Sequence, residues 1–242
     1  PSGNDTIDKI IRRTQTNESI LDFYWEWIPK DLTNIQYLED GAISSIYKAT
    51  WLKGYPRRHN GLRPQRGSAM VALKTLGSFD EATSIIDEFN NKILSNEKDF
   101  ETRSEIYVVT FLVQTNQIAT VMDFYEGGSL RNLLQKQEFS SIECIDTIFN
   151  IALCLGYRHS LEIFHCNLHT NNILLTRYNN HYNPKICNNW NIVISDFGLS
   201  NVFNYLAATQ GGSYGSIPYI APEIFKGYPH SRATDIYALG MI

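Results

Sequence analysis

Cysteine is scarce in this chain of 242 residues, and its spacing does not suggest a disulfide framework. Small secreted domains that depend on disulfides carry cysteine at a much higher density. Here the cysteines form no C-x-x-C pair and fall in segments with helical or loop patterns: Cys144, Cys154, Cys166 and Cys187. The cysteine content therefore favours a reduced compartment, and we expect the chain to be cytoplasmic.

Long apolar runs and an excess of positive charge are also missing. No stretch approaches the roughly 20 apolar residues of a membrane-spanning helix, and the first residues, PSGNDTIDKIIRRTQ, lack the apolar core of a signal peptide. The net charge is −4, whereas proteins that bind nucleic acid or anionic membranes usually present a basic surface. We therefore expect a soluble globular protein whose partners are neither nucleic acid nor membrane.

The pattern of apolar residues changes along the chain. Residues 1–34 have charged and apolar positions at helical spacing, which predicts an N-terminal helical extension. Between residues 35 and 125, one predicted helix at about 80–95 interrupts a series of predicted antiparallel strands, which are rich in β-branched and aromatic residues. The strand segments are NIQYLED, SSIYKATW, AMVALKTL, EIYVVTFLV and QIATVMDF.

Residues 126–242 have mainly helical patterns. One predicted helix ends near His159 and has an apolar stripe formed by Ile142, Ile145, Phe149, Ala152 and Leu155. Residues 53–67 are basic and rich in glycine and proline, which indicates a solvated loop between strands or a docking patch. Residues 176–191 form a second polar segment, which we interpret as a surface loop.

Three segments carry the most specific pattern: HCNLHTNNILL from 165, ISDFGLS from 194 and SIPYIAPEIFKG from 216. In this order they resemble the catalytic loop, the DFG turn and the end of the activation segment of protein kinases. VALK, VMDFYEGGSL and DIYALG extend the resemblance over residues 35–242. The phrases KATWLKGYP, NNILL and YGSIPYIAPEIFKG are most similar to the tyrosine-kinase-like group, especially to sets expanded in some soil fungi.

The resemblance implies an α+β class and a bilobal protein-kinase fold. Residues 35–125 would form the small lobe, a five-stranded antiparallel sheet with one helix, and residues 126–242 a mainly helical large lobe. Because DIYALGMI resembles the start of the central helix of that lobe, and the chain stops there, we expect the large lobe to be partial and truncated in this helix.

The resemblance also implies ATP and Mg²⁺ as ligands. Lys74 in VALK matches the lysine that holds the α- and β-phosphates, and the backbone of Asp123 and Tyr125 matches the hinge that binds adenine. Asn172 and Asp196 match the two magnesium ligands, and both offer the oxygen atoms that this cation prefers. Elsewhere Met122 matches the gatekeeper, while His165 and Asp235 match the pair that supports the catalytic loop.

The segments around the phosphates depart from the family pattern. In YLEDGAISSIYKATW, Glu39, Gly41 and Ser44 stand at the three glycine positions, so only Gly41 remains to let the backbone approach phosphate. We expect the Glu39 carboxylate to lower phosphate affinity. In EFNNKIL, Lys92 stands where an acid should pair with Lys74; two ammonium groups at ~4 Å would repel by about 4 kcal/mol. Either the helix moves outward, Glu88 supplies the acid, or the alignment is shifted.

The catalytic loop has lost two functional residues. Cys166 replaces the arginine that binds a phosphorylated activation segment, and Asn167 replaces the aspartate that accepts the substrate proton. A general base typically contributes ~10²–10⁴ in rate, and a loose transition state makes the loss partial rather than complete. His169 stands where serine/threonine kinases often have lysine, which leaves the acceptor type open.

Three functions fit this sequence. The first is a nucleotide-binding pseudokinase that acts in signalling as a scaffold or allosteric partner of an unidentified protein, because the base position holds Asn167. The second is a weakly active ATP-dependent serine/threonine or tyrosine protein kinase, which the retained Lys74, Asn172 and Asp196 favour. The third is a partial chain without an independent role, which would not unfold cooperatively.

Overall fold

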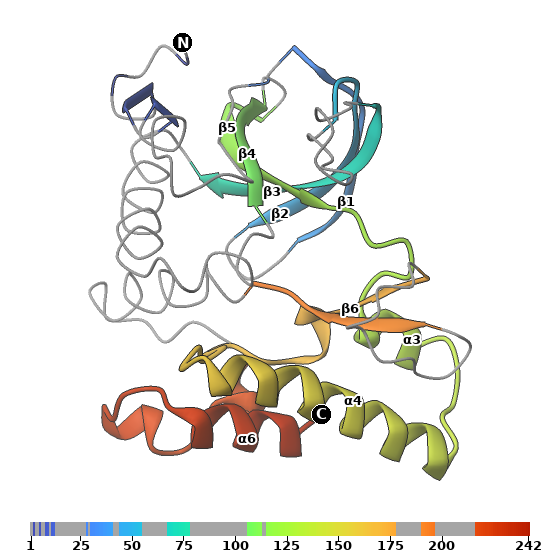
Figure 1. Cartoon of the computed structure of the whole chain (residues 1–242), viewed down its shortest axis with the longest axis vertical. Helices are drawn as coiled ribbons and strands as arrows, with labels where there is room; N and C mark the ends of the chain where they lie inside the picture. The colour runs from blue at the N-terminus through green and yellow to red at the C-terminus, as the bar shows by residue number, and fades with distance from the viewer. Residues whose placement is uncertain are drawn as a thin grey trace. The chain divides into compact units, whose positions relative to one another are not determined.

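The computed structural model of the chain describes part of the sequence and divides it into two compact units, residues 1–124 and 125–242 (Figure 1). Their boundary lies inside VMDFYEGGSL, the segment that the sequence predicts as a hinge. The described residues are 2, 5, 8, 9, 11, 12, 28, 30–40, 44–54, 67–77, 106–112, 115–177, 190–196 and 216–242.

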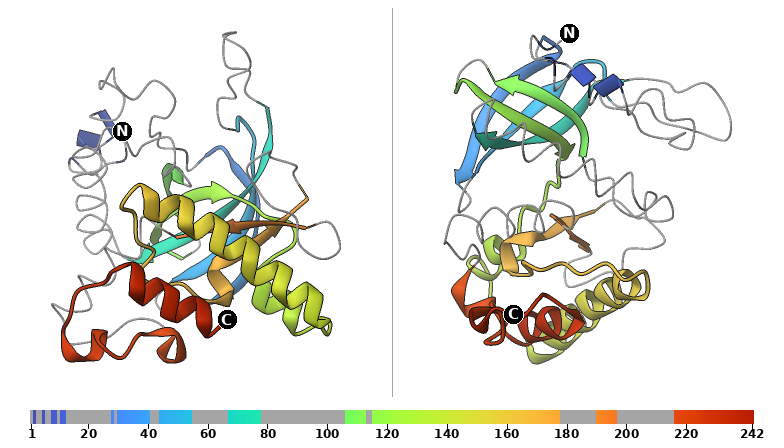
Figure 2. Two further views of the ribbon diagram at one scale, coloured as in Figure 1. Left: turned by 60° about the horizontal axis from the view of Figure 1, so that its bottom comes forward. Right: turned by 90° about the vertical axis from the view of Figure 1, so that its left-hand side faces the viewer.

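The first unit is built on a five-stranded antiparallel sheet with the strand order β1-β2-β3-β5-β4. Figure 2 shows the sheet as a strongly twisted layer. All five strands coincide with segments predicted from β-propensity. They are β1 (Leu32–Asp40), β2 (Ser45–Trp51), β3 (Ala69–Gly77), β4 (Ile106–Leu112) and β5 (Gln117–Asp123).

Strand β1 begins two residues earlier than NIQYLED and includes the last residues assigned to the N-terminal extension. The reason is burial: Leu32 packs in the apolar cluster of this unit together with Ile28, Trp51 and Leu73. Packing thus extends the strand toward the N-terminus beyond Asn34, although Asn34 itself has a left-handed backbone conformation with φ 52.

Two predicted elements of the first unit are described little or not at all. In the predicted N-terminal extension, the structure describes a few scattered residues as helical: Asp5, Asp8, Lys9, Ile11 and Arg12. The helix predicted at about 80–95 lies outside the described residues, and so do most of the basic segment 53–67 and residues 41–43.

The second unit combines helices with a small sheet. Its longer elements are α3 (Leu130–Leu134), α4 (Ser141–Ser160), β6 (Ile173–Thr176), β7 (Asn191–Ile194) and α6 (Arg232–Gly240), with 3₁₀ turns at Thr170–Asn172, Ile217–Tyr219 and Ile224–Lys226. Strands β6 and β7 are antiparallel, and α3, α4 and α6 share one buried apolar cluster with them. The two units therefore have the α+β architecture of a bilobal kinase fold, as predicted.

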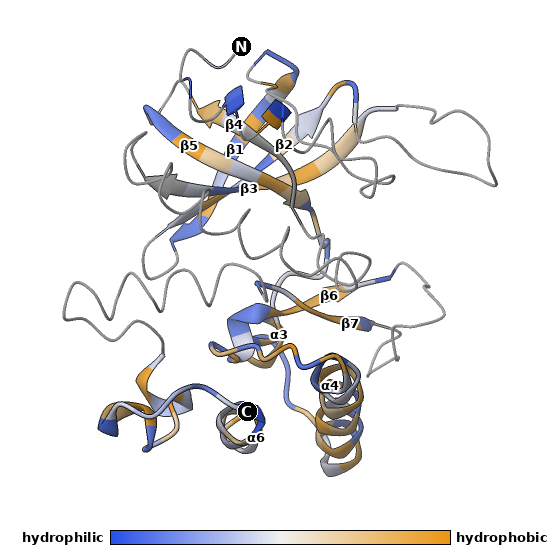
Figure 3. Cartoon of the chain, turned by 60° about the vertical axis from the view of Figure 1, so that its left-hand side comes forward, coloured by the Kyte–Doolittle hydropathy of each residue, from blue (hydrophilic) through white to orange (hydrophobic). Residues whose placement is uncertain are grey.

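The apolar stripe predicted for α4 is buried only in its last part, where Leu155 is buried and Ala152 is partly buried. Ile142, Ile145 and Phe149 are exposed, with relative accessibilities of 72%, 66% and 60%. Ile151, which is not part of the predicted stripe, is buried together with Leu155 and polar neighbours. Apolar residues occur along most of α4 and do not single out one face (Figure 3). Its predicted end near His159 is correct, and the start is fixed by a capping box between Ser140 and Glu143.

The described cysteines Cys144, Cys154 and Cys166 are free thiols. None of the helices in the described ranges is both long and apolar enough to cross a membrane.

The packing predicts opposite effects for alanine at two glycines of the second unit. A Cβ on Gly127 would lie 2.6 Å from Leu175 Cβ and 2.8 Å from the Trp190 ring, so we expect Gly127→Ala to destabilise the unit by about 1–3 kcal/mol. A Cβ on Gly156 of α4 meets nothing within 4 Å, and Gly156→Ala should stabilise by about 0.5–1 kcal/mol. Urea unfolding of both variants tests this; equal free energies of unfolding would contradict it.

Candidate functional site

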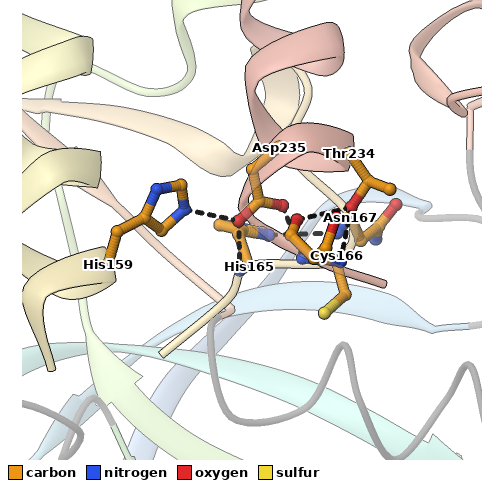
Figure 4. A network of polar contacts seen from close by, with 7 residues as sticks. His159, His165, Cys166, Asn167, Thr234 and Asp235 are labelled. Atoms are coloured by element: carbon orange, nitrogen blue, oxygen red, sulfur yellow. Dashed lines mark hydrogen bonds and ion pairs between the residues drawn. The ribbon is translucent and has the colours of Figure 1, made fainter. Parts of the chain in front are cut away.

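The catalytic-loop segment is attached to helix α6 through one buried carboxylate, that of Asp235. Its Oδ2 accepts a hydrogen bond from the backbone N–H of His165 at 2.7 Å, and its Oδ1 accepts one from the N–H of Cys166 at 2.9 Å. His159 of α4 donates from Nε2 to Oδ2 at 2.9 Å, since a carboxylate can only accept (Figure 4). One side chain therefore joins α4, α6 and the loop.

His165 lies between the loop and the end of β7. Its Nε2 is 2.8 Å from the carbonyl oxygen of Ser195 and must carry the proton, whereas Nδ1 accepts from the N–H of Asn167 at 3.2 Å. The ring is fully buried, and this burial lowers the pKa of His165 although the Asp235 carboxylate opposes the shift. The imidazole is thus neutral and fixes both the loop and the residue before Asp196.

The predicted magnesium ligands Asn172 and Asp196 are brought together by the backbone. The N–H of Ser195 donates to the carbonyl of Asn172 at 2.8 Å, which places Asp196 beside the 3₁₀ turn that carries Asn172. The Asn172 amide donates from Nδ2 to the carbonyl of Asn167 at 2.9 Å. Because Nδ2 is used in this bond and donates, the carboxamide oxygen is the atom of Asn172 that would bind a cation.

The donor atoms of this pair fit Mg²⁺. A carboxylate and a carboxamide oxygen are the hard ligands that this cation takes in small number, and its remaining ligands are usually water and phosphate. Asn172 and Asp196 would hold the ion, which would neutralise phosphate charge when bound. Among the described residues, no group of three or more His, Cys, Asp or Glu side chains forms another metal cluster.

Two residues of this region have a left-handed backbone conformation, Cys166 with φ 67 and Asp196 with φ 68. Side chains other than Asn and Asp seldom adopt it, and such strain costs on the order of 1–3 kcal/mol. The bond from the Cys166 N–H to Asp235 stabilises the first of these conformations. The loop conformation is therefore imposed by α6.

Lys74 lies in the first unit on β3, where it pairs with Ile46 of β2 and Thr120 of β5. Alternation along β3 puts Lys74 and Ala72 on the face opposite to Val71 and Leu73, which are buried in the apolar cluster. The lysine is partly buried on this second face. The sheet thus presents Lys74 away from the core, as a ligand-binding residue requires.

The predicted hinge residues lie on either side of the division between the units. Asp123 ends β5 in the first unit and Tyr125 begins the second, while Met122, the predicted gatekeeper, is buried in β5. Glu126 accepts from the backbone N–H of Arg177 at 2.8 Å and so connects the start of the second unit to the end of β6.

The structure thus brings Asn167, Asn172 and Asp196 together in the second unit and carries Lys74 in the first. Other predicted positions lie outside the described residues: Gly41, Glu88, Lys92 and the phenylalanine and glycine of DFG. His159 was not among the predicted site residues. A histidine at the end of an apolar helix gives no signal of its role, because its partner Asp235 lies 76 residues away in the chain.

The family model for protein tyrosine and serine/threonine kinases matches residues 32–242, which is most of the chain. The chain belongs to this kinase family. Among curated kinases, it is 26% identical to the serine/threonine-protein kinase Nek1 of Mus musculus over 73% of its own length and 15% of that protein. It is 36% identical to the dual specificity protein kinase splA of Dictyostelium discoideum over 50% of its length and 5% of that protein.

A third relative extends the similarity over nearly the whole kinase-like chain. The Raf homolog serine/threonine-protein kinase of Caenorhabditis elegans is 27% identical over 90% of the chain and 25% of that protein. The chain thus spans a quarter or less of the length of these three kinases. The similarity is limited to the matched segments of these kinases. The five-stranded sheet and the helical second unit have the architecture of the small and large lobes of a kinase fold.

The neutral, buried His165 predicts that the large lobe loses stability in mild acid. Its pKa is lowered in the folded state, so the folded lobe binds fewer protons than the unfolded chain. The free energy of unfolding should therefore fall as the pH drops below the unfolded pKa of about 6.5. Urea unfolding between about pH 7.5 and 5.5 measures the slope.

Burial also lowers the pKa of His230, which contributes with the same sign and provides a comparison. His165→Gln should reduce the pH slope more than His230→Gln does, because His165 is the more deeply buried ring. A slope that is unchanged in His165→Gln would contradict the assignment.

Proposed function

We propose that the chain is a nucleotide-binding kinase-like domain that transfers phosphate poorly, and that it acts in signalling as a scaffold or allosteric partner of another protein. The carrying observation is Asn167, a carboxamide at the base position of a loop whose supporting hydrogen bonds to His165 and Asn172 are present. A carboxamide can orient a hydroxyl group but hardly accepts its proton, so transfer would lose the contribution of a general base.

Nucleotide binding is supported by the residues that remain. Lys74, on the face of β3 opposite the apolar cluster, would pair with phosphate, and Asn172 and Asp196 would hold Mg²⁺. The second candidate function, a weakly active serine/threonine or tyrosine kinase, rests on the same residues. Placement in the tyrosine-kinase-like group is also proposed, from the phrases NNILL and YGSIPYIAPEIFKG.

Nucleotide binding predicts a thermal shift. Magnesium-ATP should raise the melting temperature according to RT ln(1 + [L]/Kd), and Lys74→Ala should abolish the increase because it removes the phosphate partner. Lys53→Ala is the matched control: this lysine is bound to Asp31 at 3.0 Å at the far end of β2, and its loss should leave the shift intact. No shift at millimolar nucleotide would refute nucleotide binding.

The missing base predicts a gain of function on its restoration. Asn167→Asp should raise phosphate transfer from labelled ATP to a generic protein acceptor, by at most the ~10²–10⁴ of a general base and by less if phosphate binding also limits the rate. Asn171→Asp adds the same charge to an exposed position of the same loop and should change nothing. Asp196→Ala should abolish any transfer.

If the Asn167→Asp variant transfers phosphate at the same rate as the unmodified chain, proton acceptance by a base does not limit the rate. Brisk transfer by the unmodified chain, sensitive to Asp196→Ala, would instead favour the weakly active kinase.

A further inference from the structure

One row of residues runs across the sheet of the small lobe and ends at Lys74. Glu39 of β1 is opposite Ile46 of β2, and Ile46 is opposite Lys74 of β3. Directly opposed residues of antiparallel strands project to the same face of a sheet. Glu39 and Lys74 therefore share one face, separated by Ile46 and about 10 Å between their backbones.

A register shift in β1 is the reason that Glu39 reaches this face. Tyr37 is opposite Tyr47, and uninterrupted pairing would next put Leu38 opposite Ile46. The strand is irregular between Tyr37 and Glu39, so Glu39 takes that place instead. Bulges of this kind redirect side chains and are frequent beside functional sites.

The neighbouring acid, Asp40, behaves differently. It is opposite Ser45, and alternation puts both on the other face of the sheet. Its Oδ1 accepts from the Ser45 hydroxyl at 2.7 Å, and this bond, followed by one from the Tyr37 hydroxyl, lowers the pKa of Asp40. The Ser45 N–H is bound in turn to Thr75 Oγ1 at 2.8 Å. Asp40 thus connects the end of β1 to the start of β2.

The Glu39 carboxylate has no such role. It is exposed, and it makes no hydrogen bond or ion pair with the described part of the chain. The backbones of Glu39 and Lys74 are about 10 Å apart, so this carboxylate would act most on a phosphate group held by Lys74 at low ionic strength, where the screening length exceeds the roughly 8 Å of physiological salt. Each further phosphate group would be attracted by the Lys74 ammonium and repelled by the Glu39 carboxylate.

We propose that Glu39 makes this site select against phosphate charge, so that it binds adenine nucleosides and nucleotides with few phosphates at least as well as free ATP. The proposal rests on the proposed nucleotide binding and specifies its ligand class. Glu39 acts as the specificity-determining residue through its charge, because the row Glu39–Ile46–Lys74 fixes the side on which that charge lies.

The test compares adenosine, ADP and ATP by isothermal titration calorimetry of the full chain, without magnesium so that phosphate charge is not masked. The unmodified chain should bind ATP no more tightly than adenosine. Glu39→Gln keeps the shape and removes the charge; it should raise ATP affinity about tenfold and leave adenosine unchanged. The gain should shrink at high salt, as expected for a screened interaction.

Asp40→Asn is the matched control, because it removes one charge from the adjacent residue on the opposite face. It should leave the ratio of the ATP and adenosine affinities unchanged. An ATP affinity that does not change in Glu39→Gln, or that rises equally in Asp40→Asn, overturns the selection by Glu39 while nucleotide binding stands. If neither adenosine nor ATP binds to any of these proteins, the proposed nucleotide binding fails and the selection fails with it.

Discussion

The carboxylate of Asp235 is the interaction on which the large lobe depends. A buried charge is costly unless hydrogen bonds replace its hydration. Here three donors do so, the backbone N–H groups of His165 and Cys166 and the ring of His159. Since the donors come from α4 and from the loop, while Asp235 belongs to α6, the same bonds that satisfy the charge also hold the catalytic-loop segment in its conformation.

This arrangement explains how the loop can keep its conformation after losing its acid. Asp235 binds the backbone at positions 165 and 166, and Asn172 binds the carbonyl at 167. At positions 165 to 167 these bonds use backbone atoms, whose partners are the side chains of Asp235, His165 and Asn172. These particular hydrogen bonds therefore depend on the backbone of Cys166 and Asn167 and do not require an arginine or an aspartate side chain at these positions.

Much of the fold could be predicted from the sequence, because β-propensity and turns located all five strands of the small lobe and the kinase-like motifs gave the order of the elements. The buried face of α4 could not, since apolar residues such as Ile142 and Phe149 occur on its exposed side as well. Tertiary packing decides between two apolar faces, and periodicity does not contain that information.

The candidate site was predictable to the extent that local motifs carry it. Lys74, Asn172 and Asp196 stand in recognisable short segments. The contribution of His159 depends on a contact with Asp235 across 76 residues, and the side on which Glu39 lies depends on a register shift within β1. Neither feature has a local signature in the sequence. The contact between His159 and Asp235 requires the packed helices, and the position of Glu39 requires the paired strands.

Under the proposed function, the retained and the replaced residues would act on different steps of phosphoryl transfer. Asn167 would affect proton acceptance, whose loss typically costs ~10²–10⁴ in rate, whereas the positioning of the reactants is worth considerably more. Lys74, Asn172 and Asp196 are the residues that would position a nucleotide and its metal ion, and all three remain. A domain that keeps the positioning residues and lacks the general base would still bind its ligand. This is why we favour binding over turnover as its function.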